Sequence, residues 1–123
     1  MDYVLHNAGA HNYIEISDRD FILESEQDAL DLAVLCVETG SSWLLLNRTN
    51  LSGVFFDLSS GLAGAALQKF SNYRINFAAI IPQERIAGRF GEMVLESNRG
   101  KQFRFFTEKA EAEKWLTESI VSH

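Results

Sequence analysis

Cysteine and proline are nearly absent from this chain of 123 residues, which contains one of each. With Cys36 alone no internal disulfide can form, and zinc sites built on paired cysteines are excluded. No segment approaches the about 18 consecutive apolar residues of a membrane span. Residues 1–6 lack the basic start and the long apolar run of a signal peptide. We therefore expect a soluble protein in the reducing environment of the cytoplasm.

Basic residues are in the minority, because 11 lysines and arginines stand against 17 acidic residues and give a formal net charge of −6. This excess disfavours a nucleic-acid backbone or an anionic membrane as the partner, since both are negatively charged. Histidine is scarce as well: His6 and His11 flank a predicted turn, and His123 is the last residue. Such positions indicate neither a metal site nor a catalytic triad. We assign no metal, no cofactor and no catalytic residue.

Hydrophobic residues make up 46% of the chain, which is enough for one ordinary core and too little for two. The sequence contains no repeat, no low-complexity stretch and no linker. Residues 1–123 are therefore predicted to form a single domain.

Strand-like and helix-like segments alternate along the chain. Residues 3–6 and 11–16 favour strands, and Asn7-Ala8-Gly9-Ala10 between them suits a four-residue hairpin turn. Three more runs of strand length follow, the first two nearly continuous in apolar residues, as is typical of strands covered on both faces. These runs are residues 43–46, 75–81 and 103–106.

Helical signals separate these strands. The first helix is predicted to begin at Ser25, to end at Gly40, and to be largely buried because it is apolar nearly all round. Later helices are indicated by apolar stripes in residues 62–70 and 86–94 and by a helix start near Thr107. The resulting order, ββαβαβαβα, predicts an α/β fold with a mixed, mainly parallel sheet and an antiparallel hairpin at its edge. The predicted core includes Leu32, Leu35, Leu67, Phe77 and Trp115.

The segment of residues 57–64 combines a carboxylate, two hydroxyls and two glycines where a helix is predicted to begin. Unpaired N–H groups and the partial positive charge of a first helical turn stabilise an oxyanion or a phosphorylated serine. The alternative is that an Asp or Ser side chain caps the helix while the glycines allow close packing. The candidate partner- or ligand-binding residues in this segment are Asp57, Ser59, Ser60, Gly61 and Gly64.

Residues 55–62 resemble the segment of STAS domains, the anti-sigma-factor antagonist fold, in which an Asp-Ser-Ser-Gly-Leu motif opens the second helix. The element order after the motif agrees. The resemblance implies a STAS-like fold in which a partner kinase phosphorylates the serine before the glycine, which is Ser60 here. Because Leu58 is inserted after Asp57, Ser60 aligns with the motif and Asp57 does not.

A second resemblance covers most of the chain. Several short blocks at matching spacings are similar to the bacterial family called domain of unknown function 4180. The resemblance implies a bacterial protein to which no activity is assigned. The blocks are Asp28-Ala29-Leu30-Asp31-Leu32, Phe55-Phe56-Asp57-Leu58, Gly61-Leu62-Ala63-Gly64, Leu67-Gln68-Lys69-Phe70, Asn72-Tyr73-Arg74 and Glu96-Ser97-Asn98-Arg99-Gly100.

Polar residues close two of the predicted helices. In last turns, cations complement the helix dipole and amides satisfy free carbonyl groups, so a structural role is one interpretation. The alternative is a shared polar network that fixes an interface or a ligand, if the two helices pack side by side. The residues are Gln68, Lys69, Asn72 and Arg74 in one helix end and Glu96, Asn98 and Arg99 in the other.

Two hypotheses about function follow. The first is a non-enzymatic regulatory domain that contacts a protein partner around Ser60, with phosphorylation of Ser60 as the switch. The second is a small-molecule module, or a modest enzyme, that binds a phosphate-bearing ligand at the same helix start. In the second hypothesis Arg48 supplies the counter-charge, because ligands gather beyond the carboxyl ends of strands in open α/β sheets. The oligomeric state is left open.

Overall fold

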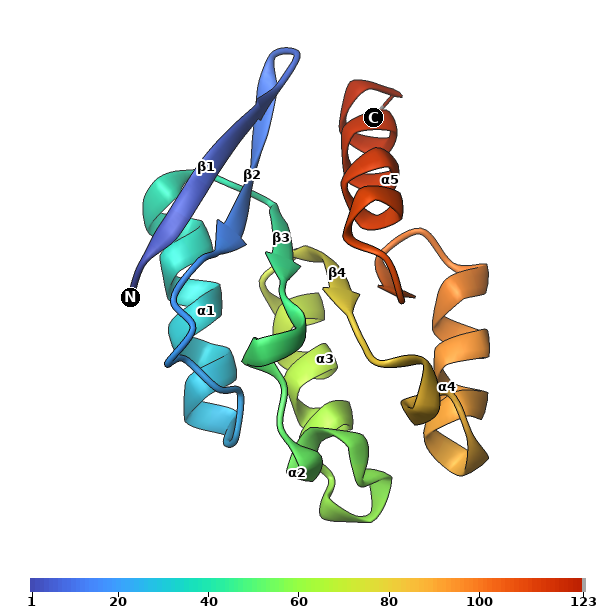
Figure 1. The fold of residues 1–123 in the computed structure, drawn as a ribbon. Helices are drawn as coiled ribbons and strands as arrows, with labels where there is room; N and C mark the ends of the chain where they lie inside the picture. The colour runs from blue at the N-terminus through green and yellow to red at the C-terminus, as the bar shows by residue number, and fades with distance from the viewer. Residues whose placement is uncertain (123) are drawn as a thin grey trace.

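A computed structural model describes residues 1–122, and His123 lies outside the described residues. The chain forms one five-stranded sheet in the order β1-β2-β3-β4-β5, with β1 antiparallel to β2 and all other pairs parallel (Figure 1). The α/β class and the mainly parallel sheet predicted from the sequence are confirmed. The strands are β1 (Tyr3–Ala8), β2 (His11–Ile16), β3 (Trp43–Leu46), β4 (Asn76–Ile80) and β5 (Phe103–Phe106).

Helices cover both faces of this sheet (Figure 1). Three of them pack on one face around Ile14, Leu44 and Phe77, and α5 packs alone on the other face around Tyr13 and Leu45. Neighbouring residues of β2 and β3 therefore point into different cores, as the alternation of a strand requires. The three helices are α1 (Glu26–Thr39), α3 (Leu62–Asn72) and α4 (Gly88–Arg99), and α5 is Lys109–Ser122.

The apolar runs form strands because they have an apolar core on each side. All four residues of β3 are buried, and so are Phe77 to Ile80 of β4. A continuous apolar run is stable in such a strand, whereas a strand with one wet face would alternate with polar residues.

The hairpin turn is tighter than predicted. Ala8 pairs with His11, so the turn has two residues, Gly9 and Ala10, and β1 extends to Ala8 while β2 has the predicted bounds. Gly9 has a φ of 66°, the left-handed conformation that a two-residue turn favours. In this register His6 pairs with Tyr13, so His6 and His11 are not opposite each other.

Two helix predictions need correction. The helix α1 begins and ends as predicted, with a capping box at Ser25 and a left-handed Gly40, but only one side of it faces the core. Val34 and Val37 are 40% and 61% exposed. Residues 57–61 do not open α3, because the left-handed Gly61 (φ 78°) separates a short 3₁₀ turn, η2 (Leu58–Ser60), from α3.

The predicted core residues lie in or beside the core. Leu32 and Phe77 are fully buried, whereas Leu35, Leu67 and Trp115 are partly buried and pack against it. The remaining short elements are 3₁₀ turns and one helical turn at the sheet edge: η1 (Arg48–Asn50), α2 (Gly53–Phe56) and η3 (Gln83–Arg85). No helix of residues 1–122 has both the length and the apolar character needed to cross a bilayer.

Truncation of Leu32 is expected to destabilise the protein much more than truncation of an exposed apolar residue on the same helix. Leu32→Ala removes fully buried methyl groups and should lower the free energy of unfolding by about 2–5 kcal/mol. Val37→Ala should change it by less than about 0.5 kcal/mol. Urea denaturation of both variants measures the two changes, and equal losses would contradict the one-sided burial of α1.

Candidate functional site

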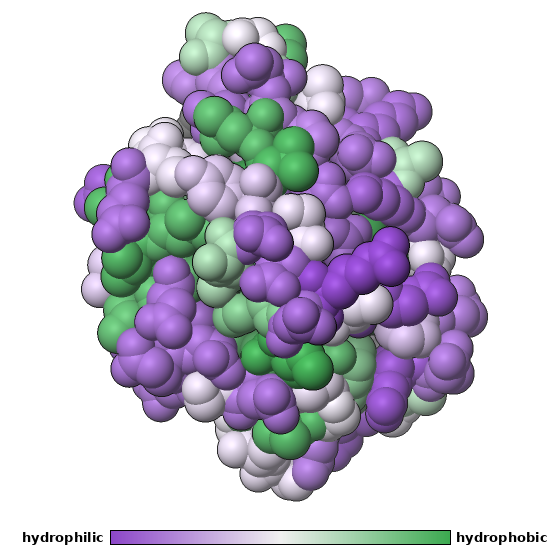
Figure 2. Space-filling view, turned by 60° about the vertical axis from the view of Figure 1, so that its left-hand side comes forward, coloured by the Kyte–Doolittle hydropathy of each residue, from purple (hydrophilic) through white to green (hydrophobic). Residues whose placement is uncertain are grey.

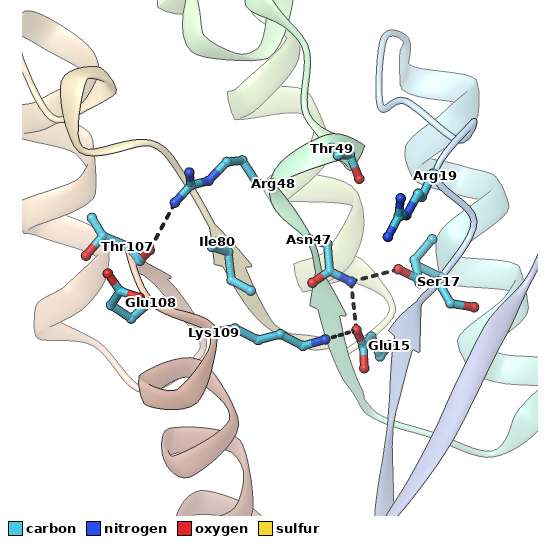
Figure 3. A pocket seen from close by; sticks show the side chains of 11 residues that line it. Glu15, Ser17, Arg19, Asn47, Arg48, Thr49, Ile80, Thr107, Glu108 and Lys109 are labelled. Atoms are coloured by element: carbon cyan, nitrogen blue, oxygen red, sulfur yellow. Dashed lines mark hydrogen bonds and ion pairs between the residues drawn. The ribbon is translucent and has the colours of Figure 1, made fainter.

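A hollow of about 680 Å³ opens at the carboxyl ends of the strands β2, β3, β4 and β5 (Figure 3). The first turn of α5 forms one wall, the turns after β2 and β3 form the opposite wall, and Ile16 and Ile80 contribute apolar surface. Because the carboxyl ends of parallel strands are the usual ligand site of open α/β sheets, this position makes the hollow the candidate site.

Glu15 is the buried acidic residue of this site. Its side chain is only 9% exposed, and three other side chains contact its two oxygens. Lys109 Nζ donates to Oε2 over 2.6 Å, Asn47 Nδ2 donates to the same oxygen over 2.8 Å, and His6 Nε2 lies 2.8 Å from Oε1. One carboxylate thus joins β1, β2, the end of β3 and the start of α5.

These contacts keep Glu15 ionised. Burial by itself raises the pKa of a carboxyl, because it disfavours the charged form. Hydrogen bonds from Lys109, Asn47 and His6, together with the charge of Lys109, outweigh burial and hold the pKa of Glu15 below its ordinary value. Since an ionised carboxylate only accepts hydrogen bonds, the Nε2 atom of His6 carries the proton of that contact.

Tyr13 lies beside this carboxylate on β2. Its side chain is buried, and the ring of His6 stacks on it with 4.7 Å between ring centroids. Burial, and then the nearby carboxylates of Glu113 and Glu15, raise the pKa of Tyr13 to about 12. The phenol is therefore protonated at neutral pH.

Side-chain amides fix the wall that follows β3. Asn47 Nδ2 donates to the Ile16 carbonyl as well as to Glu15, and the Asn47 backbone N–H donates to Asn50 Oδ1 over 2.9 Å. Asn50 is fully buried and donates to the carbonyls of Asp18 and Phe21. The turn after β3 is thereby bonded to the loop after β2, so the site has a defined shape.

Positive charge predominates at the mouth of the hollow. Arg48 reaches from η1 to the turn before α5, where one guanidinium nitrogen donates to the Thr107 carbonyl over 3.3 Å. Arg19 projects from the loop after β2 on the other side (Figure 3). The first turn of the 14-residue α5 adds the positive end of its dipole. Because Lys109 is paired with Glu15, the charged side chains that remain on the lining are the two arginines and Glu108, which together leave a net positive charge.

Comparison with known families shows which family the chain belongs to. A family model described as Domain of unknown function (DUF4180) matches residues 8–116. The chain belongs to this family. No match was found among curated proteins or among solved structures. The matched range of this DUF4180 domain includes Glu15, Asn47, Arg48 and Lys109, while His6 lies before it.

The structure separates Arg48 from the serine segment. Arg48 lines the hollow, and neither Asp57 nor Ser60 does. The Asp57 side chain accepts hydrogen bonds from the backbone N–H and the hydroxyl of Ser59, and Asp57 thereby caps η2. Ser60 is exposed, and its hydroxyl lies 2.8 Å from the Val54 carbonyl, 2.7 Å from the Asp57 carbonyl, and 3.2 Å from the Leu62 N–H that donates to it.

The glycines and helix-end residues of the DUF4180 domain lie elsewhere. Gly61 is the left-handed residue before α3, and Gly64 is exposed in its first turn, with no atom that would obstruct a Cβ within 4 Å. The polar residues make local contacts within each helix end: Gln68 donates to Asn72, and Glu96 pairs with Arg99 over 3.5 Å at exposed positions. Asn98 instead bonds both backbone groups of Phe105 in β5. Lys69 is half-buried near the end of α3, and Arg74 follows it with a φ of 57°.

The sequence indicated that Arg48 follows a strand end. It did not indicate Glu15, Arg19 or Lys109 as site residues, nor that Asn47 donates a hydrogen bond to Glu15. A weak signal for Glu15 exists, because a charged residue follows Tyr13-Ile14 within an otherwise apolar strand end. Its main partner, Lys109, lies 94 positions away. No local pattern links the two residues.

We expect Glu15→Gln to destabilise the protein in a pH-dependent way. The pKa of Glu15 is lowered on folding, so its contribution to stability is full above the pKa of the unfolded chain and is lost as the pH falls through the folded value. At pH 7 the variant should lose about 1–3 kcal/mol of unfolding free energy, because hydrogen bonds to a charged group are lost. The difference from the natural chain should shrink as the pH falls below about 4.

Urea denaturation between pH 7 and pH 2.5 measures this difference, with Glu92→Gln on exposed α4 as the matched control. A loss that stayed constant across this range would contradict the ionised state of Glu15.

Proposed function

We propose that this domain binds a small anionic molecule, bearing a phosphate or carboxylate group, in the hollow at the carboxyl edge of the sheet. The observation that carries the proposal is the meeting of Arg19, Arg48 and the first turn of α5 at one hollow of a chain whose net charge is −6. An acidic protein that gathers positive charge at a concave site offers a local attraction for anions.

The chemistry of the walls suits such a ligand. Two guanidinium groups on opposite walls can donate paired hydrogen bonds to an anionic group. Ser17, Thr49 and Thr107 line the same hollow, and their hydroxyls can donate or accept. The volume of about 680 Å³ is within the range of small-molecule sites, about 300–1,000 Å³. A ligand with an anionic end and an apolar body fits both the arginines and Ile80.

Loss of either arginine is expected to weaken anion binding. The probes are inorganic phosphate, pyrophosphate and citrate, measured by the midpoint of thermal unfolding and by isothermal titration calorimetry. A probe at 100 times its Kd should stabilise the natural chain by about 2.7 kcal/mol. Arg19→Gln and Arg48→Gln should each lower the affinity about tenfold, since a charge-assisted hydrogen bond contributes about 1.5–3 kcal/mol.

Arg89→Gln is the matched control, because Arg89 is an exposed arginine on α4, on the other face of the sheet. The proposal would be abandoned if none of the three anions stabilised the protein, or if Arg89→Gln lowered the affinity as much as Arg48→Gln.

A second candidate function is a STAS-like regulatory domain of the bacterial cytoplasm whose protein partner recognises the surface around Ser60. It is favoured by the exposure of Ser60. Phosphorylation would add about −1.5 to −2 charges and remove the hydroxyl proton that faces the Val54 and Asp57 carbonyls. The turn before α3 would then change its hydrogen bonds where a partner contacts it.

Ser60→Asp is expected to change partner binding more than stability. The partner would be recovered by pull-down from native cell extract, and its affinity for the variants measured with thermal unfolding as the control. Ser60→Ala should retain binding but cost about 0.5–2 kcal/mol, because the Leu62 N–H loses its acceptor. Ser71→Asp, at an exposed position near the other end of α3, is the matched charge control. Equal affinities for the natural chain and Ser60→Asp would leave Ser60 as a helix cap.

A further inference from the structure

Strand β1 presents an open edge of the sheet. The Asp2 carbonyl accepts a hydrogen bond from the Ser17 N–H over 3.1 Å, which sets the alternation of the β1–β2 ladder. In an antiparallel pair, alternate residues turn their N–H and C=O groups away from the partner strand. The outward groups of β1 are therefore those of Tyr3, Leu5 and Asn7.

At the opposite edge of the sheet, in β5, a side chain covers outward backbone groups. In β5 the N–H of Phe105 donates to Asn98 Oδ1 over 2.8 Å, and its carbonyl accepts from Asn98 Nδ2 over 3.1 Å. A side-chain amide from α4 thus occupies the hydrogen-bonding groups that another strand would need. Edge strands are commonly protected by charges, proline or such coverage. Residues 3–8 contain neither proline nor an acidic or lysine or arginine side chain.

Apolar side chains accompany the open edge. Tyr3, Val4 and Leu5 are 42%, 42% and 46% exposed. Tyr3 and Leu5 pair with Ile16 and Ile14, so they point to the face of the sheet that α1 covers. The edge offers a partner strand both backbone bonds and apolar contacts.

A shallow groove of about 310 Å³ continues this surface onto α1. Met1, Leu30 and Val34 supply its apolar part, and Asp31 and Glu38 are on its lining as well. Helix α1 carries four acidic residues and no basic one. Figure 2, which brings this side of the molecule forward, shows apolar surface interrupted by hydrophilic residues.

We propose that β1 and this groove bind an extended segment of a partner protein, added to the sheet as a sixth strand, whose apolar and basic residues lie at every second position and so face α1 together. Backbone groups of Tyr3, Leu5 and Asn7 supply the affinity, and Asp31 and Glu38 select basic side chains. A second copy of this chain fits less well. Antiparallel pairing of two β1 strands would place both α1 helices on the same face of the joined sheet, where their acidic residues have no basic residue to offset them.

A library of random twelve-residue peptides displayed on phage tests this site while the partner is still unidentified. Enriched sequences are expected to carry apolar residues and lysine or arginine at every second position, because such residues share one face of a strand. In solution, a selected peptide should slow hydrogen exchange of the Tyr3, Leu5 and Asn7 amides. Leu5→Pro removes only an outward N–H and should lower the affinity about tenfold. Leu5→Lys is a second edge variant, which blocks the strand by charge if the proline variant does not fold.

Charge selection is tested by two double variants with the same change in net charge. Asp31→Asn with Glu38→Gln should weaken binding about threefold, while Glu92→Gln with Glu111→Gln, at exposed positions of α4 and α5, should not. The proposal is overturned if no basic peptide is enriched, if folded Leu5→Pro and Leu5→Lys bind like the natural chain, or if both double variants bind equally. It is also overturned if sedimentation shows a dimer of this chain that Leu5→Lys dissociates. None of these outcomes depends on anion binding at the hollow.

Discussion

The ionised carboxylate of Glu15 is the constraint on which the arrangement of the site depends. A buried charge without partners costs several kcal/mol, so a fold that keeps Glu15 ionised must bring donors to it from elsewhere in the chain. Here the donors come from β1, from the end of β3 and from the first residue of α5. The contacts of Asn47 and Lys109 fix the turn after β3 and the start of α5, which sheet hydrogen bonds do not position. The distance between the wall after β3 and the wall formed by α5 follows from this one residue.

The same pairing decides which charges remain for a ligand. Lys109 faces the hollow but is held by Glu15 at 2.6 Å, so its charge is offset inside the protein. Arg19 and Arg48 have no acidic side chain within ion-pair distance among residues 1–122. In the proposed anion site, the two arginines outside the buried network would contact the ligand, and the residues of the buried network hold the walls in place.

The sequence allowed prediction of the elements better than of the site. Continuous apolar runs such as residues 43–46 require two covered faces, and that requirement already favours a parallel sheet with helices on both sides. Arg48 was predicted to face the helix start at Ser60, but the structure places it at the carboxyl ends of the strands, in a hollow that Ser60 does not line. Glu15 and Lys109 could not be paired from the sequence, because their meeting depends on the register of β2 and on the path of α5. The start of α3 was misplaced for a local reason: Gly61 breaks the helical turn that the serines were expected to begin.

The two edge strands of the sheet, β1 and β5, differ in whether a side chain bonds their outward backbone groups. Asn98 caps β5 and ends the sheet there, whereas no side chain of residues 1–122 bonds the outward backbone groups of Tyr3 and Leu5 in β1. Strand β1 is held by its hairpin with β2 and by the contact of His6 with Glu15, and His6 and Leu5 are adjacent in the chain. Glu15 lines the hollow and also contacts His6 of β1, so one hydrogen bond connects the hollow to the edge strand.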